Sequence, residues 1–145
     1  MRNTYQSPVG PLSVALDDGR VAALRWGGGA PDLAGPVADW LDGYFAGSPG
    51  LLPPLVPMPT AFQERFRAAL IAIPWGQTRT YGQLAAELCV SAQAIGQACG
   101  ANPIPILVPC HRVLGSCGLG GFSGGSGIET KVALLRHECA AGLLI

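Results

Sequence analysis

The chain has few charged residues, few histidines and no long apolar segment. Its 145 residues include nine Lys and Arg against nine Asp and Glu, so the formal net charge is zero. A neutral chain has little non-specific affinity for nucleic acid. No apolar run reaches the ~18 residues that a membrane span needs, and polar residues interrupt the N-terminal segment where a secretory signal would lie. We therefore expect a cytoplasmic protein that does not bind membranes.

Signatures of metal sites and disulfide frameworks are also missing. Only two histidines are present, the cysteine count is odd, and no C-x-x-C pair occurs. A zinc finger or a disulfide scaffold requires a more regular cysteine spacing. We therefore expect no metal ion, and reduced thiols as in a reducing compartment. The five cysteines are Cys89, Cys99, Cys110, Cys117 and Cys139.

Charge and proline divide the chain into two parts. Residues 1–57 carry three basic and five acidic side chains, whereas residues 58–145 carry six basic and four acidic ones. Five prolines between Pro49 and Pro59 predict a linker. We expect a small N-terminal domain with its linker over residues 1–57. The domain over residues 58–145 is the better partner for phosphates.

Apolar periodicity in the first part predicts a hairpin and one helix. Apolar residues alternate over residues 12–16, Asp17-Asp18-Gly19 offers a turn, and a second strand runs over residues 21–26. Apolar residues at helical spacing then predict an amphipathic helix near residues 36–46.

Capping signals predict three helices in the second part. Thr60 with Gln63 and Thr80 with Gln83 fit capping boxes, and Ser91 can cap a third helix that ends near Gly100. The last two helices are short and joined by a tight turn, which is typical of a helix-turn-helix. The third helix has almost no side-chain bulk. It either packs closely against a neighbour or presses into a DNA minor groove, which is only ~6 Å wide. Its small residues include Ala92, Ala94 and Gly96.

The segment Pro103–Val113 concentrates the reactive residues. An apolar run with three prolines ends in Cys110, His111 and Arg112. We expect a stiffened strand that delivers Cys110 as a nucleophile, because a thiolate is the reactive form of cysteine. A core strand with a buried structural cysteine is the alternative. In extended backbone, neighbouring side chains face opposite ways, so a water is expected to bridge Cys110 and His111.

This segment resembles a known active-site motif. Asn102-Pro103 and Pro109-Cys110-His111-Arg112-Val113 stand as in the O6-alkylguanine-DNA alkyltransferases, the methylated-DNA–protein-cysteine methyltransferase family. The resemblance extends from about Thr60 to Glu138 and more weakly over the first 57 residues. It implies a small α/β N-terminal domain, an antiparallel sheet plus a helix, followed by a mainly helical, winged-helix-like domain with a helix-turn-helix.

The resemblance also implies an activity. The protein would repair double-stranded DNA by direct reversal, moving an alkyl group from O6-alkylguanine, and from O4-alkylthymine as a further candidate, onto Cys110. The base would be flipped out while one helix binds the minor groove. The reaction would be single-turnover, by a monomer without a cofactor.

Individual roles follow from the same resemblance. Glu138, His111 and a water would relay the proton of Cys110, Tyr81 would protonate the leaving base, and Asn102 would brace the loop. Gln93 stands where the family has an arginine that fills the gap left by the flipped base, which is a departure. The glycine-rich loop over residues 114–127 would cover the pocket. The remaining candidates for binding DNA or the base are the backbone of Val113, Phe122 and Ser123, and Arg112, whose family counterpart more often links the two domains. His137 is expected at the surface.

Three other functions remain open at this point. An alkyltransferase-like protein would bind damaged DNA and flag it without efficient transfer, although such proteins replace the nucleophile that this chain keeps. An unrelated cysteine hydrolase would need an oxyanion hole, and a helix-turn-helix regulator would not need the motif at residues 109–113.

Overall fold

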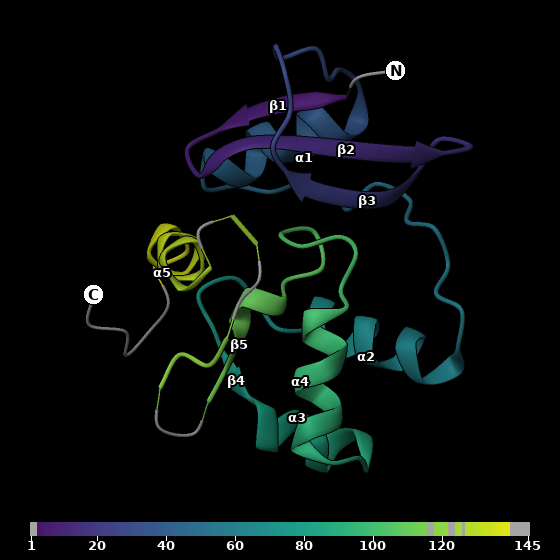
Figure 1. Cartoon of the computed structure of the whole chain (residues 1–145), viewed down its shortest axis with the longest axis vertical. Coiled ribbons are helices and arrows are strands. Elements are labelled where there is room, and N and C mark those ends of the chain that lie inside the picture. The colour runs from purple at the N-terminus through teal and green to yellow at the C-terminus, as the bar shows by residue number, and fades with distance from the viewer. Residues whose placement is uncertain (1–2, 116–117, 122–123, 126, 140–145) are drawn as a thin grey trace. The chain divides into compact units, whose positions relative to one another are not determined.

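The computed structural model describes residues 3–115, 118–121, 124–125 and 127–139. The chain divides into two compact units, Met1–Val56 and Pro57–Ile145, and each is considered separately. Within the described residues the chain forms a small antiparallel sheet, a two-stranded parallel pair, five α-helices and one 3-10 turn (Figure 1).

The first unit is an antiparallel sheet of order β1-β2-β3 with one helix. The strands are β1 (Thr4–Ser7), β2 (Gly10–Asp17) and β3 (Arg20–Trp26), and the helix is α1 (Pro36–Phe45). The predicted hairpin is confirmed. Asp18 and Gly19 both have positive φ, at 50° and 78°, as the type I′ turn of a two-residue hairpin requires. Strand β1 was not predicted, because four residues are too few to show an alternating pattern.

One face of this sheet forms the core of the unit. Leu12, Val14 and Leu24 are buried, and Val14 lies opposite Leu24 in the β2–β3 register. Helix α1 is joined to β1 through Tyr5, whose hydroxyl donates to Asp42 at 2.7 Å. Part of the predicted linker also belongs to this unit, since Leu55 forms a parallel bridge with Val21 at the edge of the sheet.

The second unit is mainly helical. Its helices are α2 (Ala61–Ile71), α3 (Tyr81–Leu88), α4 (Ala92–Gly100) and α5 (Ile128–His137), and Cys110–Arg112 form the 3-10 turn η1. Both predicted capping boxes and the Ser91 cap are confirmed. Helices α3 and α4 pack together and are joined by the turn at residues 89–91, with Cys89 in the left-handed region at φ 57°. Within the described residues, no helix is long and apolar enough to cross a membrane.

A short parallel pair brings the start of α3 beside the reactive segment. Strand β4 (Arg79–Thr80) pairs with β5 (Val113–Leu114), so that Arg79 lies opposite Val113. Two-residue strands carry no periodic pattern, and the sequence gives no sign of this pairing. As a consequence, Tyr81 directly follows Thr80, which lies opposite Leu114 in the segment leaving Cys110.

The predicted strand before Cys110 is wrong. Residues 103–108 form turns, closed by a hydrogen bond from the Val108 amide to the Ile104 carbonyl at 2.9 Å. Ile106 has φ 74°, in the left-handed region that β-branched residues rarely adopt. The prolines explain the difference, because each removes a backbone donor that a sheet would need. The apolar residues of this run are nevertheless buried, so the run indicated burial rather than a strand.

Loss of the α2 cap should destabilise the protein measurably. In Thr60→Ala the Gln63 amide loses its side-chain acceptor, now at 3.2 Å, and we expect the free energy of unfolding to fall by about 1 kcal/mol. Urea denaturation measures the change. Thr78→Ala, which removes a threonine outside both capping boxes, is the control, and an equal loss in it would contradict the capping role.

Candidate active site

Cys110 begins the η1 turn, and its side chain lies in the interior. The residue is 7% exposed, and its amide donates to the Val108 carbonyl at 2.8 Å. Asn102 braces the loop before it. The Asn102 amide donates to the Val108 carbonyl at 2.9 Å and accepts from the Ile104 amide at 3.1 Å. The same side chain hydrogen-bonds to the Cys110 sulfur. One amide therefore holds both ends of the loop and the thiol.

Burial raises the pKa of the Cys110 thiol. The Asn102 hydrogen bond and the positive charge of Lys131 favour the thiolate, but desolvation outweighs both. The sulfur is therefore protonated at neutral pH in the free protein, and a base is needed when it reacts.

His111 is positioned to be that base. Its Nε2 lies 2.6 Å from Glu138 Oε2, and both side chains are fully buried. Burial lowers the pKa of His111, although the hydrogen bond and charge of Glu138 act against the shift. We assign the proton of the neutral ring to Nε2, which donates to the carboxylate. Nδ1 is then a free acceptor, and it has no partner among the described residues.

Arg112 is not placed to contact DNA, which corrects that prediction. The residue is 8% exposed, and its Nε donates to Glu138 Oε1 at 2.7 Å. A terminal nitrogen donates to the Ile73 carbonyl at 2.6 Å. The guanidinium therefore links the ends of α2 and α5 to η1 inside the second unit. A phosphate would have to displace these buried bonds.

His137 is also placed differently from the prediction. It is half-buried rather than exposed, and its ring meets that of Trp75 edge to face, with centroids 5.4 Å apart.

Tyr81 has the Cys110 thiol among its electrostatic neighbours. It is half-buried at the first turn of α3, and its pKa is raised, first by burial and then by the charges of Cys99 and Cys110. The Gly121 amide hydrogen-bonds to the Tyr81 oxygen and opposes the shift. The hydroxyl therefore keeps its proton at neutral pH and can donate it.

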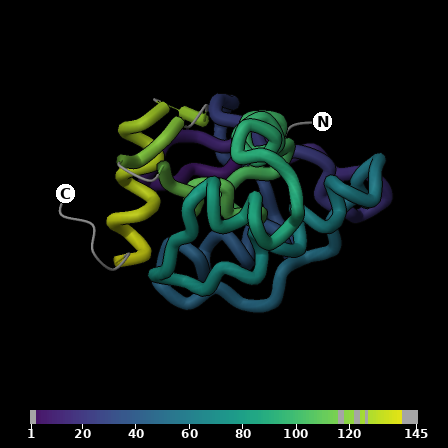
Figure 2. The backbone as a smooth tube through the Cα atoms, turned by 90° about the horizontal axis from the view of Figure 1, so that it is seen from below, coloured from purple at the N-terminus to yellow at the C-terminus, as the bar shows by residue number. Residues whose placement is uncertain are grey.

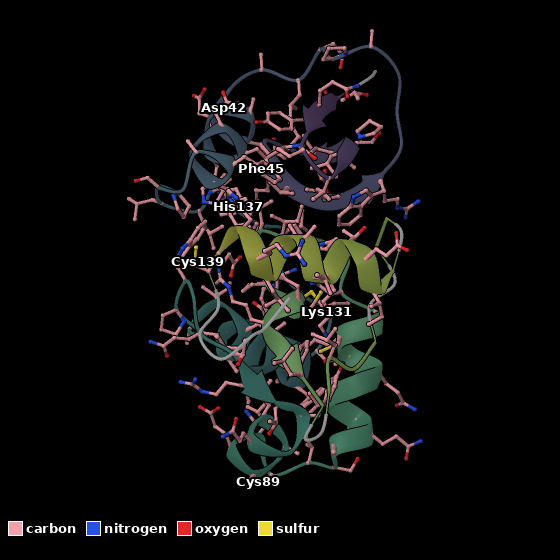
Figure 3. The ribbon with its side chains drawn as sticks, turned by 90° about the vertical axis from the view of Figure 1, so that its left-hand side faces the viewer. Asp42, Phe45, Cys89, Lys131, His137 and Cys139 are labelled. Carbon is pink, nitrogen blue, oxygen red and sulfur yellow. The ribbon has the colours of Figure 1, made fainter. Side chains whose placement is uncertain are left out.

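Lys131 is a site residue that the sequence reasoning missed. Its Nζ donates to the Val113 carbonyl at 2.7 Å and to the Gly121 carbonyl at 3.1 Å, and lies 5.9 Å from the centre of the Tyr81 ring. Figure 3 shows Lys131 on the side of α5 that faces β5. Its helical spacing to the buried Leu134 and Leu135 is the signal that could have found it.

Helix α4 presents its small residues to the surface. Ala92, Gln93 and Gly96 are exposed, Ala94 is half-buried, and Ile95 alone anchors the helix as a fully buried residue. A Cβ built on Gly96 would meet no described atom within 4 Å. Close packing against a neighbour in the described part of the chain therefore does not explain the glycine at position 96.

Two predicted pocket residues, Phe122 and Ser123, lie outside the described residues, as does Cys117. Val113 is fully buried, and its carbonyl accepts a hydrogen bond from Lys131. Among the described residues no group of three possible metal ligands occurs.

The buried thiol, neutral imidazole and carboxylate define a cysteine-nucleophile site. The model of the family described as 6-O-methylguanine DNA methyltransferase, DNA binding domain, matches residues 61–140. A methylated-DNA–protein-cysteine methyltransferase of Mycobacterium tuberculosis is 39% identical over 93% of this chain and 90% of its own. Its Salmonella typhimurium counterpart is 39% identical over 91% of each chain.

Solved structures agree with these sequence comparisons. A crystal structure of the Mycobacterium tuberculosis O6-methylguanine methyltransferase has a TM-score of 0.80 at 36% identity, over 99% of this chain and 95% of that chain. The structure of that organism's OGT in complex with DNA has a TM-score of 0.81 at 39% identity, over 94% and 91% of the two chains. The chain therefore belongs to the methylated-DNA–protein-cysteine methyltransferase family, which confirms the resemblance seen in the sequence.

The buried neutral histidine predicts a pH-dependent stability. Because the pKa of His111 is lowered in the folded state, the unfolded chain binds the proton more readily, and stability falls as pH drops below about 6.5. Between pH 7 and 5 we expect the free energy of unfolding to fall by up to about 1.4 kcal/mol per pH unit from this group. Urea denaturation at several pH values measures the slope.

The second histidine supplies the control. His111→Gln should flatten the slope, whereas His137→Gln should retain it. An unchanged slope in His111→Gln would show that another group titrates.

Proposed function

We propose that the protein repairs DNA by transferring an alkyl group from O6 of guanine to Cys110, once per protein molecule. The observation that carries this proposal is the buried Cys110 thiol beside the His111–Glu138 pair, in a chain whose relatives bear the name of that activity. The retained thiol favours transfer over a role that only flags damage.

The site residues support a displacement reaction. A water passes the Cys110 proton to Nδ1 of His111, and Glu138 stabilises the imidazolium that forms. The sulfur attacks the alkyl carbon as the carbon–O6 bond breaks, and the electron pair of that bond stays on guanine. Tyr81 donates its proton to the base, and the phenolate left behind faces the Lys131 ammonium. The thioether product is stable, so the protein is not regenerated.

The exposed surface of α4 supports binding in a minor groove. We propose that α3 and α4 act as a helix-turn-helix in a winged-helix-like domain, and that Ala92, Ala94 and Gly96 let the α4 backbone approach the sugar edges. Gln93 is exposed and would fill the gap left by the flipped base. The unit over residues 57–145 would thus bind DNA and react, and we expect a monomer acting in the cytoplasm.

Intact mass spectrometry tests the transfer. After incubation with a duplex containing O6-methylguanine, we expect one added methyl group on Cys110, none in Cys110→Ala, and an undiminished addition in Cys139→Ala, which removes an exposed thiol. Binding of the duplex without a mass increase would overturn the proposal in favour of a protein that only flags damage.

Replacement of Gln93 tests base extrusion. Gln93→Arg adds a planar guanidinium that can stack in the gap, so we expect the transfer rate on duplex DNA to rise about threefold or more. Free O6-methylguanine, which needs no extrusion, should react at an unchanged rate. Gln97→Arg, exposed one turn further along α4, controls for the added charge. No change, or a fall, in Gln93→Arg would count against this role.

A further inference from the structure

In the glycine-rich loop after β5, the backbone of Gly120 lies directly against the side chain of Tyr81. A Cβ built on Gly120 would stand 2.7 Å from Cε2 of the Tyr81 ring and 2.8 Å from its hydroxyl oxygen, closer than real side chains approach. The Gly120 backbone also has φ 70°, in the left-handed region that favours glycine. The backbone of the loop therefore occupies the space that any side chain at this position would need.

The next residue, Gly121, holds the loop against Tyr81 through both its amide and its carbonyl. The Gly121 amide hydrogen-bonds to the Tyr81 oxygen, and the Gly121 carbonyl accepts from Lys131 at 3.1 Å. Lys131 also donates to the Val113 carbonyl, so the ammonium ties the loop to β5. Figure 2 shows the loop, in light green, running beside α5 in yellow. The Tyr81 hydroxyl is thus held by a loop that is itself held to the reactive segment.

We propose that Gly120 is a positioning residue for the alkyl transfer, whose missing side chain seats the Tyr81 hydroxyl against the loop and in line with the leaving base. This inference rests on the function proposed above. Any side chain at position 120 pushes the Tyr81 ring or the loop away, and either movement breaks the bond between the Gly121 amide and the Tyr81 oxygen. Proton donation depends on placement, because an error of about 1 Å can cost 10²-fold in rate.

Gly118 provides a contrast within the same loop. A Cβ at Gly118 would meet no described atom within 4 Å, and its φ lies outside the left-handed region. Gly19, in the first unit, has φ 78° and equally open surroundings. Gly118→Ala therefore controls for a general effect of alanine in the loop, and Gly19→Ala controls for the effect of a positive φ. Only Gly120→Ala also disturbs the contact with Tyr81.

Single-turnover transfer from an O6-methylguanine duplex tests the proposal. We expect Gly120→Ala to slow transfer at least about tenfold, and by no more than the 10²–10⁴-fold that general acid catalysis contributes. Alkylation of Cys110 by iodoacetamide needs no proton donor and should be unchanged. Gly120→Asn, which tolerates positive φ but carries a Cβ, should be slowed similarly and serves if the alanine variant folds poorly. Gly19→Ala should keep the wild-type rate, and Gly118→Ala should lose far less than Gly120→Ala.

A second substitution shows whether Gly120 acts through Tyr81. In a Tyr81→Ala background, Gly120→Ala should cause no further loss beyond about twofold. Three results would overturn the inference: a wild-type rate in both Gly120 variants, an equal loss in Gly118→Ala, or a full loss in the Tyr81→Ala background. Failure of the proposed function is distinct, because the wild-type protein would then transfer no methyl group at all.

Discussion

The second unit depends on one buried carboxylate. Glu138, at the end of α5, is 1% exposed and accepts hydrogen bonds from His111 and Arg112. A buried charge is costly unless it is paired, so α5 keeps its place only while both partners stay in η1. Arg112 extends the link to the end of α2 through Ile73. The position of His111, the proposed base, and the packing of α5, η1 and the end of α2 therefore depend on the same two carboxylate oxygens.

A buried site has consequences for the reactivity of its thiol. Desolvation keeps both the Cys110 sulfur and the His111 ring neutral in the free protein, although each has a charged neighbour that favours its ionised form. A neutral thiol is a poor nucleophile toward the solutes of a cell. In the proposed reaction, removal of the Cys110 proton when the flipped guanine enters would confine the transfer to the intended substrate.

The sequence predicted local structure and the reactive residues better than contacts between segments that are distant in the chain. Capping boxes are local signals, and the helices that begin at Thr60 and Thr80 were placed correctly. The β4–β5 pair and the role of Lys131 depend on contacts between distant segments, and no periodic pattern records them. The turns over residues 103–108 were misread as a strand, because a buried turn and a buried strand are equally rich in apolar residues. Composition alone left the small residues of α4 ambiguous, and the structure adds that no described atom packs against the Gly96 Cα within the reach of a Cβ.

The conformation of Ile106 indicates that the reactive segment cannot keep its geometry outside the folded unit. A β-branched residue in the left-handed region costs of order 1–3 kcal/mol, and the residue is 1% exposed. Its own burial and the two hydrogen bonds of Asn102 offset that cost only inside the folded unit. A free peptide with the sequence of residues 103–113 would relax to other conformations, and its cysteine would be an ordinary thiol. The geometry that surrounds the Cys110 thiol is thus supplied by the rest of the domain.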